Sequence, residues 1–339
     1  MFKGRIPVKA IPVASLILSV AFSTVAFAAA APNYKIVDRI KVQDGGFDYA
    51  TFDAANGRVL MARLDLTTVL DVKTGKVSEL KSAVKGHIAM PIPGSPLLLV
   101  TQRGGGIVLV DGATDKVAAE FKGGKNPDGA TYDPFSKLAF AMDHDTGDAV
   151  MIDPATKKEV GKIPVGGELE FPVSDGAGKV YVNVENKNQI AVIDVKTKKV
   201  TARYALKGCD GPTGLAYVAS AKLLISSCDG SAHVVRADNG MEVANIPTAK
   251  GADAVIYDEA RKLAFIPCRT GTLEVLSLAD PAHISIVQHM PTQVGTRTGT
   301  LDPGTGRIYT MAAKFAPPAA AGERPQAVQA SYEVLVIAP

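Results

Sequence analysis

The sequence contains no tryptophan, only three cysteines and only five histidines in 339 residues. None of the cysteines belongs to a C-x-x-C-H motif, so covalently attached haem is not expected. The histidines are dispersed along the chain, which argues against a zinc or copper site built from several imidazoles. G-x-S-x-G is absent, and the glycine-rich runs GGFDYA (45–50) and QRGGGIVLV (102–110) precede no helical pattern. A nucleophile-elbow hydrolase and a phosphate-binding loop therefore lack support.

An excess of charge of either sign is also missing. The chain has 37 Lys and Arg against 34 Asp and Glu, and the surplus is accounted for by Lys3, Arg5 and Lys9 at the N-terminus. The remaining chain is electrically balanced and has no general attraction for nucleic acid or for anionic lipid. We therefore expect no nucleic-acid partner.

One apolar run stands out, at residues 10–27, directly after these three basic residues. Its end overlaps Ala26-Phe27-Ala28, which has the small-residue pattern of a signal-peptidase site. The alternative is a membrane anchor, but the run is near the lower length limit for spanning and contains Pro12. We interpret residues 1–28 as a cleavable signal peptide, and we expect a periplasmic protein with no membrane span after cleavage.

The rest of the chain repeats itself. A basic residue followed by a short apolar strand recurs about every 40 residues: RVLMAR from 58, KLAFAMD from 137, KVYVNVE from 179, KLLISSC from 222, KLAFIPC from 262 and RIYTMAAK from 307, with PLLLVTQ from 96 in the remaining interval. Another strand follows each copy, and Asp71, Asp111, Asp153 and Asp194 share one position at its end, where a carboxylate can accept hydrogen bonds from turn N–H groups. An inner strand precedes each copy, as in YATFD (49–53) and ATYDP (130–134), so the basic-led copy is the second strand of its unit.

Four short antiparallel strands in about 40 residues are typical of one blade of a β-propeller. The seventh copy ends with YEVLVI (332–337) and lacks its outer strand, whereas YKIVDRIKV (34–42) at the other end of the chain belongs to no copy. Pairing these two strands would remove a sheet edge. We therefore predict an all-β fold: a single seven-bladed β-propeller over residues 32–339, with four-stranded antiparallel blades and a ring closed by the N-terminal strand.

Two blades carry a recognisable family pattern, QIAVIDVKTKKV (189–200) and DAVMIDPATKKEV (148–160). These units resemble those of the YVTN-repeat, YncE-like β-propellers, and the resemblance covers essentially the whole chain after the signal. It implies a propeller that binds a ligand or a protein. The absence of tryptophan removes the motifs of WD-repeat and quinoprotein propellers.

Propellers usually bind ligands at one mouth of the central channel. Counting back from the end of each inner strand gives one residue per blade at this mouth: Asp48, Ile88, Asp128, Glu170, Thr213, Asp253 and Arg297, with His87 beside Ile88. Converging carboxylates favour a cation such as Ca²⁺. The alternative is a wet, polar channel without an ion. We predict a ligand site here, and the metal interpretation assigns Asp48, Asp128, Glu170 and Asp253 as ligands.

The loops after the second strands should lie at the same mouth. They contribute Asp143, His144, Glu185 and Arg269 to the predicted site. His144 stands between two acids, which is compatible with a general base, with a metal ligand or with a solvated loop cluster.

The three cysteines predict one disulfide and one spare thiol in an exported protein. Cys209 and Cys228 fall at the same end of one blade, whereas Cys228 and Cys268 occupy equivalent positions on neighbouring blades, too far apart to be bridged. We therefore expect Cys209–Cys228, with Cys268 free.

The seventh blade carries an insertion rich in alanine and proline, at residues 315–330. We expect it over the channel mouth, as a lid or a docking strap, or else as an irregular surface loop. Two functions remain open. One is a monomeric, non-catalytic module that binds a small molecule or a protein, and the other is a lactonase-like hydrolase that depends on a divalent cation.

Overall fold

The computed structural model describes residues 1–4, 32–318 and 325–339. The chain divides into Met1–Ala31 and Pro32–Pro339. The predicted signal peptide lies outside the described residues except for Met1–Gly4. In the described part of the chain, no helix is both long and apolar enough to cross a bilayer.

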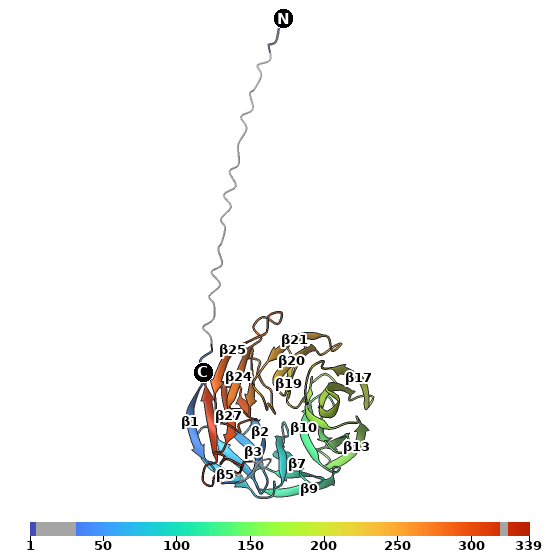
Figure 1. Ribbon diagram of the computed structural model, residues 1–339. Helices are drawn as coiled ribbons and strands as arrows, with labels where there is room; N and C mark the ends of the chain where they lie inside the picture. Colours follow the sequence, from blue (N-terminus) through green and yellow to red (C-terminus); the bar gives the residue numbers. More distant parts are fainter. Residues whose placement is uncertain (5–31, 319–324) are drawn as a thin grey trace. The chain divides into compact units, whose positions relative to one another are not determined.

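The described residues between 32 and 339 form seven four-stranded antiparallel sheets arranged around a central axis, which is a seven-bladed β-propeller (Figure 1). The strands of blades one to four are β2 (Phe47–Asp53), β3 (Arg58–Arg63), β4 (Thr67–Asp71), β5 (Val77–Leu80); β6 (Gly86–Pro91), β7 (Leu97–Gln102), β8 (Gly106–Asp111), β9 (Lys116–Lys122); β10 (Pro127–Asp133), β11 (Leu138–Asp143), β12 (Asp148–Asp153), β13 (Lys158–Pro164); and β14 (Leu169–Ser174), β15 (Lys179–Val184), β16 (Gln189–Asp194), β17 (Lys199–Ala205). Blades five to seven contain β18 (Leu215–Val218), β19 (Leu223–Cys228), β20 (Ser231–Arg236), β21 (Glu242–Pro247); β22 (Ile256–Asp258), β23 (Leu263–Cys268), β24 (Thr272–Ser277), β25 (Ser285–Pro291); and β26 (Thr300–Asp302), β27 (Arg307–Ala312), β28 (Glu333–Ala338), β1 (Lys35–Lys41). The short 3₁₀ helix η1 (Glu185–Lys187) joins β15 to β16.

The ring is closed by the two ends of the propeller, as predicted. β1 pairs antiparallel with β28, with Ile36 opposite Ile337 and Ile40 opposite Val334. Arg39 of β1 also forms an ion pair with Glu333 of β28. Because β1 supplies the outermost strand of the seventh blade, β28 is not left as an unpaired edge.

The predicted aspartate positions do cap the turns after the third strands. Asp71 Oδ1 accepts hydrogen bonds from the backbone N–H groups of Lys73 and Thr74, at 3.0 and 2.8 Å. Asp111 accepts the equivalent bonds from Ala113 and Thr114. The hydrogen bonds from Thr74 lower the pKa of Asp71, because they stabilise the charged carboxylate.

The basic residues that mark the repeat occupy two adjacent positions rather than one. Arg58, Lys179 and Arg307 are the first residues of their strands. Lys137, Lys222 and Lys262 each precede the strand and lie in the left-handed region, with φ of 59°, 52° and 54°. Gly57, with φ of 59°, fills that turn position in the first blade. The chain reverses tightly there and needs a positive φ, which glycine adopts without steric cost.

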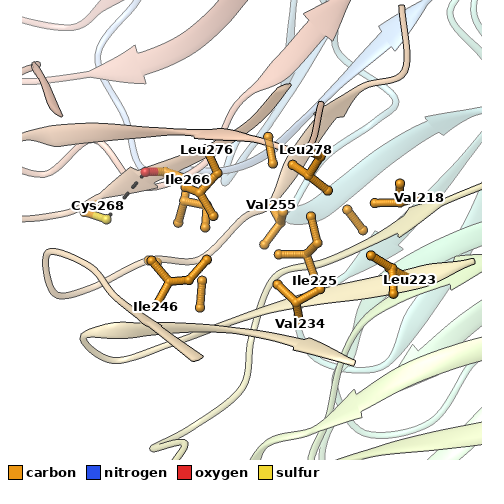
Figure 2. Packing of buried hydrophobic residues seen from close by; sticks show 14 residues of the cluster. Val218, Leu223, Ile225, Val234, Ile246, Val255, Ile266, Cys268, Leu276 and Leu278 are labelled. Atoms are coloured by element: carbon orange, nitrogen blue, oxygen red, sulfur yellow. Dashed lines mark hydrogen bonds between the residues drawn. The ribbon is translucent and has the colours of Figure 1, made fainter. Parts of the chain in front are cut away.

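Apolar side chains from neighbouring blades pack against each other and form most of the core. Figure 2 shows one such cluster, in which Ile225 and Val234 of the fifth blade face Ile266 and Leu276 of the sixth. All four side chains are fully buried. Burying a side chain of this size contributes about 1.5–3 kcal/mol, so the contacts between blades hold the ring together.

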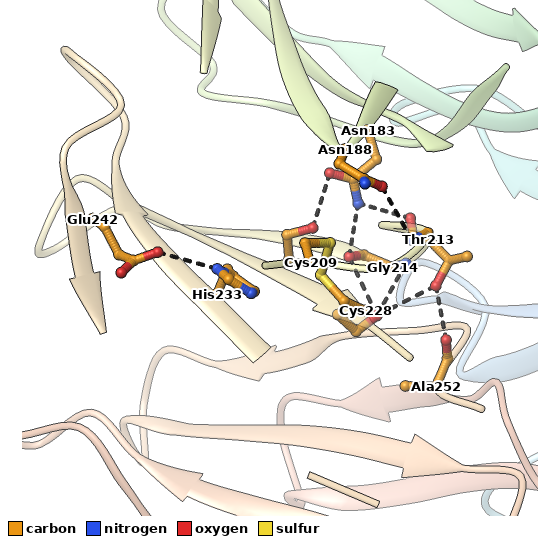
Figure 3. Close-up of a disulfide and its surroundings, with 12 residues drawn as sticks. Asn183, Asn188, Cys209, Thr213, Gly214, Cys228, His233, Glu242 and Ala252 are labelled. Atoms are coloured by element: carbon orange, nitrogen blue, oxygen red, sulfur yellow. Dashed lines mark hydrogen bonds and ion pairs between the residues drawn. A yellow bond between two sulfur atoms is a disulfide. The ribbon is translucent and has the colours of Figure 1, made fainter. Parts of the chain in front are cut away.

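The Cys209–Cys228 disulfide is present, which confirms the predicted pairing (Figure 3). It ties the loop before β18 to the end of β19. The same loop is held from the fourth blade, because the Asn183 side chain donates hydrogen bonds to the carbonyl oxygens of Thr213 and Gly214, at 2.9 and 3.0 Å. Cys268 is free and buried, and burial raises the pKa of its thiol to about 12, so it is an inert thiol at neutral pH.

Candidate functional site

Strand register defines the face on which the candidate site lies. Phe47 at the start of β2 is opposite Arg63 at the end of β3, and Pro127 at the start of β10 is opposite Asp143 at the end of β11. The beginnings of the inner strands and the ends of the second strands therefore share one face. We call this face the channel mouth.

The first cluster at the channel mouth joins three consecutive blades through His87. Its Nδ1 lies 2.9 Å from Asp48 Oδ2 and 3.4 Å from Asp128 Oδ1, and its Nε2 lies 3.1 Å from Asn126 Oδ1. Burial opposes the charged imidazole, but the hydrogen bond to Asp48 and the charge of Asp128 outweigh it, so the pKa of His87 is raised. Burial raises the pKa of Asp128 to about 6, with a further contribution from Asp48.

The second cluster is centred on His144. Its Nε2 lies 3.4 Å from Glu185 Oε2 and 3.6 Å from Glu170 Oε1, and its Nδ1 lies 3.0 Å from Asp145 Oδ1. The hydrogen bonds to Glu185 and Asp145, with the charge of Glu170, raise the pKa of His144 to about 10. Burial, together with the charges of Asp128 and Glu185, raises the pKa of Glu170 well above its usual range. The Tyr49 hydroxyl donates to Glu170 Oε2 at 3.3 Å.

The third group is a chain of alternating arginines and aspartates. Arg103 lies 2.5 Å from Asp48, whose other oxygen is 3.7 Å from Arg297. Arg297 Nε lies 2.5 Å from Asp253 Oδ2, and Arg269 lies 3.1 Å from the same oxygen. Burial raises the pKa of Asp253, although the charges of Arg297 and Arg269 oppose that shift. We call these five residues the Arg–Asp chain.

The predicted residues are therefore distributed over linked groups. Asp48 belongs both to the His87 cluster and to the Arg–Asp chain, and Tyr49 beside it contacts Glu170 of the His144 cluster. The four acids of the metal interpretation do not form one group, because Asp48 and Asp128 share His87, Glu170 lies with His144, and Asp253 lies with Arg269 and Arg297.

Asp143 takes a different place from the other predicted residues. It is fully buried, and its carboxylate accepts hydrogen bonds from the backbone N–H groups of Lys125, Asn126, Asp145 and Thr146, at 2.6 to 3.4 Å. Asp143 thus fixes the loops that carry Asn126 and His144, and it acts on the site through them.

Arg103, Asn126 and Tyr49 were not among the predicted site residues. Arg103 directly follows β7, at the position that supplies Arg269 after β23, so the repeat could have indicated it. Tyr49 follows Asp48 within an inner strand, and only the folded ring shows that its hydroxyl contacts the fourth blade.

Among the described residues, three groups have donor atoms close enough to hold a metal ion. One of them, Cys209, Cys228 and His233, has both sulfurs joined in the disulfide, which leaves two at the channel mouth. The ligand atoms of Asp48, His87 and Asp128 lie within 4.8 Å of one another, as do those of His144, Glu170 and Glu185. Each group offers one imidazole nitrogen and two carboxylates. Mixed nitrogen and oxygen donors suit transition metals better than Ca²⁺, which prefers oxygen alone.

Two cavities adjoin the Arg–Asp chain. One of about 550 Å³ is lined by Arg269, Val294, Gly295, Arg297, Phe315 and Pro325. A second of about 300 Å³ is lined by Gly46, Phe47, Leu64, Arg103, Arg297, Phe315 and Tyr332. Phe315 and Pro325 belong to the predicted insertion, so its described ends lie at the channel mouth. They are joined by a β-bridge between Phe315 and Ala327, so these ends are more regular than their composition suggested.

Comparison with known proteins identifies the fold. No family model matches the sequence, and no curated protein matches it. The chain is similar to a chain in a crystal structure of a mitotic checkpoint complex, with a TM-score of 0.74 and 12% sequence identity over 95% of this chain and 99% of that chain. At this identity the likeness shows the fold alone.

Proposed function

We propose that this propeller is an exported, YncE-like binding module without catalytic activity, and that its ligand or protein partner docks at the channel mouth. One observation carries the proposal: each of the four inner carboxylates contacts a basic side chain of the protein itself. Asp48 and Asp128 contact His87, Glu170 contacts His144, and Asp253 contacts both Arg269 and Arg297.

This internal pairing favours binding over metal-assisted hydrolysis. At Asp48 and Asp253, a metal ion would have to displace a protein cation that already holds the carboxylate oxygens, and it would meet the positive charge of the displaced group. A polar ligand, in contrast, meets donors and acceptors whose orientations are already fixed by their partners, which lowers the entropic cost of binding. The propeller scaffold is also well suited to contacts with proteins, since its loops present a broad face.

The disulfide supports export. Such bonds persist in oxidising compartments and are rare in the cytosol, so Cys209–Cys228 agrees with a periplasmic location. The blade sequence QIAVIDVKTKKV (189–200) supports the YncE-like assignment, since it follows the repeat pattern of that family.

The test is a thermal-shift screen of small metabolites and short peptides with the wild type and Asp48→Asn. The matched control is Asp238→Asn, because Asp238 is an exposed acid paired with Arg236, outside the channel mouth. We expect at least one compound to raise the melting temperature of the wild type and the control but not of Asp48→Asn. A screen in which no compound discriminates the variants would contradict the proposal.

A second candidate is a metal-dependent lactonase or ester hydrolase. The close approach of ligand atoms in the two His–carboxylate groups favours it. A bound divalent cation would supply an activated water and polarise the ester carbonyl. Hydrolysis of a lactone panel that requires added metal and is lost in Asp128→Asn would establish this function in place of the first.

A further inference from the structure

The Arg–Asp chain carries unequal numbers of opposite charges. Arg103, Arg297 and Arg269 alternate with Asp48 and Asp253, so each aspartate lies between two arginines and one positive charge remains in excess. The two terminal arginines are the most exposed members, with 42% of the Arg103 side chain and 54% of the Arg269 side chain accessible. A guanidinium has five N–H donors in a planar fork that matches a carboxylate.

Arg297 is fixed at the centre of this arrangement. It forms ion pairs with both aspartates, and its guanidinium carbon lies 5.7 Å from the centroid of the Phe47 ring. Because three partners hold it, Arg297 is oriented before any ligand arrives. It lines both cavities.

Exposed apolar side chains form part of the walls of both cavities, beside the arginines. Val294 and Phe315 line the larger cavity and Leu64 lines the smaller, and all three are large apolar side chains with at least 40% of their surface accessible. Exposed apolar side chains gathered around arginines are typical of a site for an amphipathic anion. A cavity of about 550 Å³ is also within the usual range for small-molecule sites.

We propose that the larger cavity binds a small aromatic carboxylic acid as its monoanion. The carboxylate accepts hydrogen bonds from Arg269 and Arg297, and the aromatic body lies against Val294 and Phe315. A single negative charge balances the excess positive charge of the Arg–Asp chain. This inference rests on the proposed binding function and names the class of its ligand.

Two probes of nearly equal shape test it: 2-naphthoate, which is a monoanion, and 2-naphthamide, which is neutral. Their affinities for the full chain are measured by isothermal titration calorimetry. We expect one naphthoate per chain, bound roughly 10- to 100-fold more tightly than the amide, as charge-assisted hydrogen bonds imply.

Three variants locate the site. Arg269→Gln should reduce the affinity for naphthoate to that for the amide. Val294→Asp removes an apolar contact shared by both probes and adds a negative charge to the same cavity, so it should weaken both and weaken naphthoate more than the amide. The matched control is Arg236→Gln, since Arg236 is an exposed arginine paired with one aspartate at the opposite end of β20 from the mouth; it should change neither affinity.

Equal affinity for the two probes, or unchanged naphthoate binding in both Arg269→Gln and Val294→Asp, would overturn the inference. Val294→Asp keeps the test valid if Arg269→Gln fails to fold. If naphthoate does not bind but the metabolite screen still finds a ligand that depends on Asp48, the ligand class is wrong and the binding function stands. If both experiments are negative, both proposals fail.

Discussion

His87 Nδ1 lies 2.9 Å from Asp48 Oδ2, although the two residues are 39 positions apart in the sequence. This separation is close to the length of one blade, so the two residues come from equivalent positions of neighbouring inner strands. Asn126, which contacts the other ring nitrogen, is a further 39 positions along. The residues of the first cluster at the channel mouth therefore meet because the sequence repeats at about the length of one blade.

The high pKa of His144 gives a pH-dependent stability. Its pKa is about 10 in the folded protein against 6.5 for the ordinary group, because the Glu185 and Asp145 hydrogen bonds favour the charged form. The contribution of these His144 interactions to the free energy of unfolding is therefore complete below about pH 6.5, and it is lost as the pH rises through about 10. We expect His144→Gln to lower the free energy of unfolding by at least about 1 kcal/mol at pH 6 and by much less at pH 10.5.

Urea unfolding of both proteins across this range measures the difference. His283→Gln is the control, since His283 is an exposed histidine paired with a single aspartate. A stability difference for His144→Gln that is constant between pH 6 and pH 10.5 would contradict the prediction.

The effect of Asp128 on stability should depend on pH in the opposite sense from that of an ordinary ion-paired acid. Burial raises its pKa to about 6 in the folded protein, so the folded state binds its proton more tightly than the unfolded state. The charged Asp128 carboxylate therefore destabilises the folded protein. This destabilisation is complete above about pH 6 and disappears as the pH falls to about 4. We expect Asp128→Asn to be more stable than the wild type by about 1–2 kcal/mol at pH 8 and equally stable at pH 4. Chemical denaturation of both proteins at the two pH values measures the difference in unfolding free energy. A variant that is less stable than the wild type at pH 8 would count against the raised pKa.

The disulfide should stabilise the fifth blade. It joins residues with a sequence separation of 19, and closing a loop of this size contributes about 3 kcal/mol in the chain-entropy model. We expect Cys209→Ser/Cys228→Ser to lose about 2–4 kcal/mol of unfolding free energy, measured under oxidising conditions. In the Cys268→Ala variant, the Cys209–Cys228 disulfide should still form, and most of the free energy of unfolding should be retained. Equal stability of the double variant and the wild type would show that the loop is held by Asn183 alone.

The ring closure predicts a defined effect of removing β1. Deleting residues 32–41 leaves β28 without its partner strand and exposes an unpaired sheet edge. We expect the truncated protein to melt at a lower temperature and to form oligomers in sedimentation experiments. A truncated protein that stays monomeric with an unchanged melting temperature would mean that β1 contributes nothing to closure.

The fold could be predicted because a propeller repeats one pattern of turns and apolar strands. Seven copies, and two incomplete ends with complementary strands, determine the number of blades and the pairing of β1 with β28. The position of each basic residue relative to the start of its strand could not be predicted from the sequence. Lysine and glycine both occur at the left-handed turn position, as Lys137 and Gly57 show.

The candidate site could be predicted only in part. Counting along the inner strands placed Asp48 and Asp128 at one position, but it assigned Ile88 to that position in the second blade, with His87 beside it. Gly86 pairs with Gln102 as Phe47 pairs with Arg63, so the structure puts His87 at the position of Asp48. Asp253 and Arg297 precede the much shorter strands β22 and β26, so their ion pair depends on loop conformation. Asp143 could not be recognised as a loop support, because its carboxylate binds backbone N–H groups that leave no signal in the sequence.

Metal analysis of the purified protein by mass spectrometry, combined with melting curves in Ca²⁺, Mg²⁺ and Zn²⁺, tests most directly whether the inner carboxylates bind an ion. The pairing of Asp48, Asp128, Glu170 and Asp253 with protein cations predicts less than stoichiometric metal and an unchanged melting temperature. A stoichiometric ion that is lost in Asp128→Asn/Glu170→Gln would contradict the proposed binding module and establish a metal site at the channel mouth.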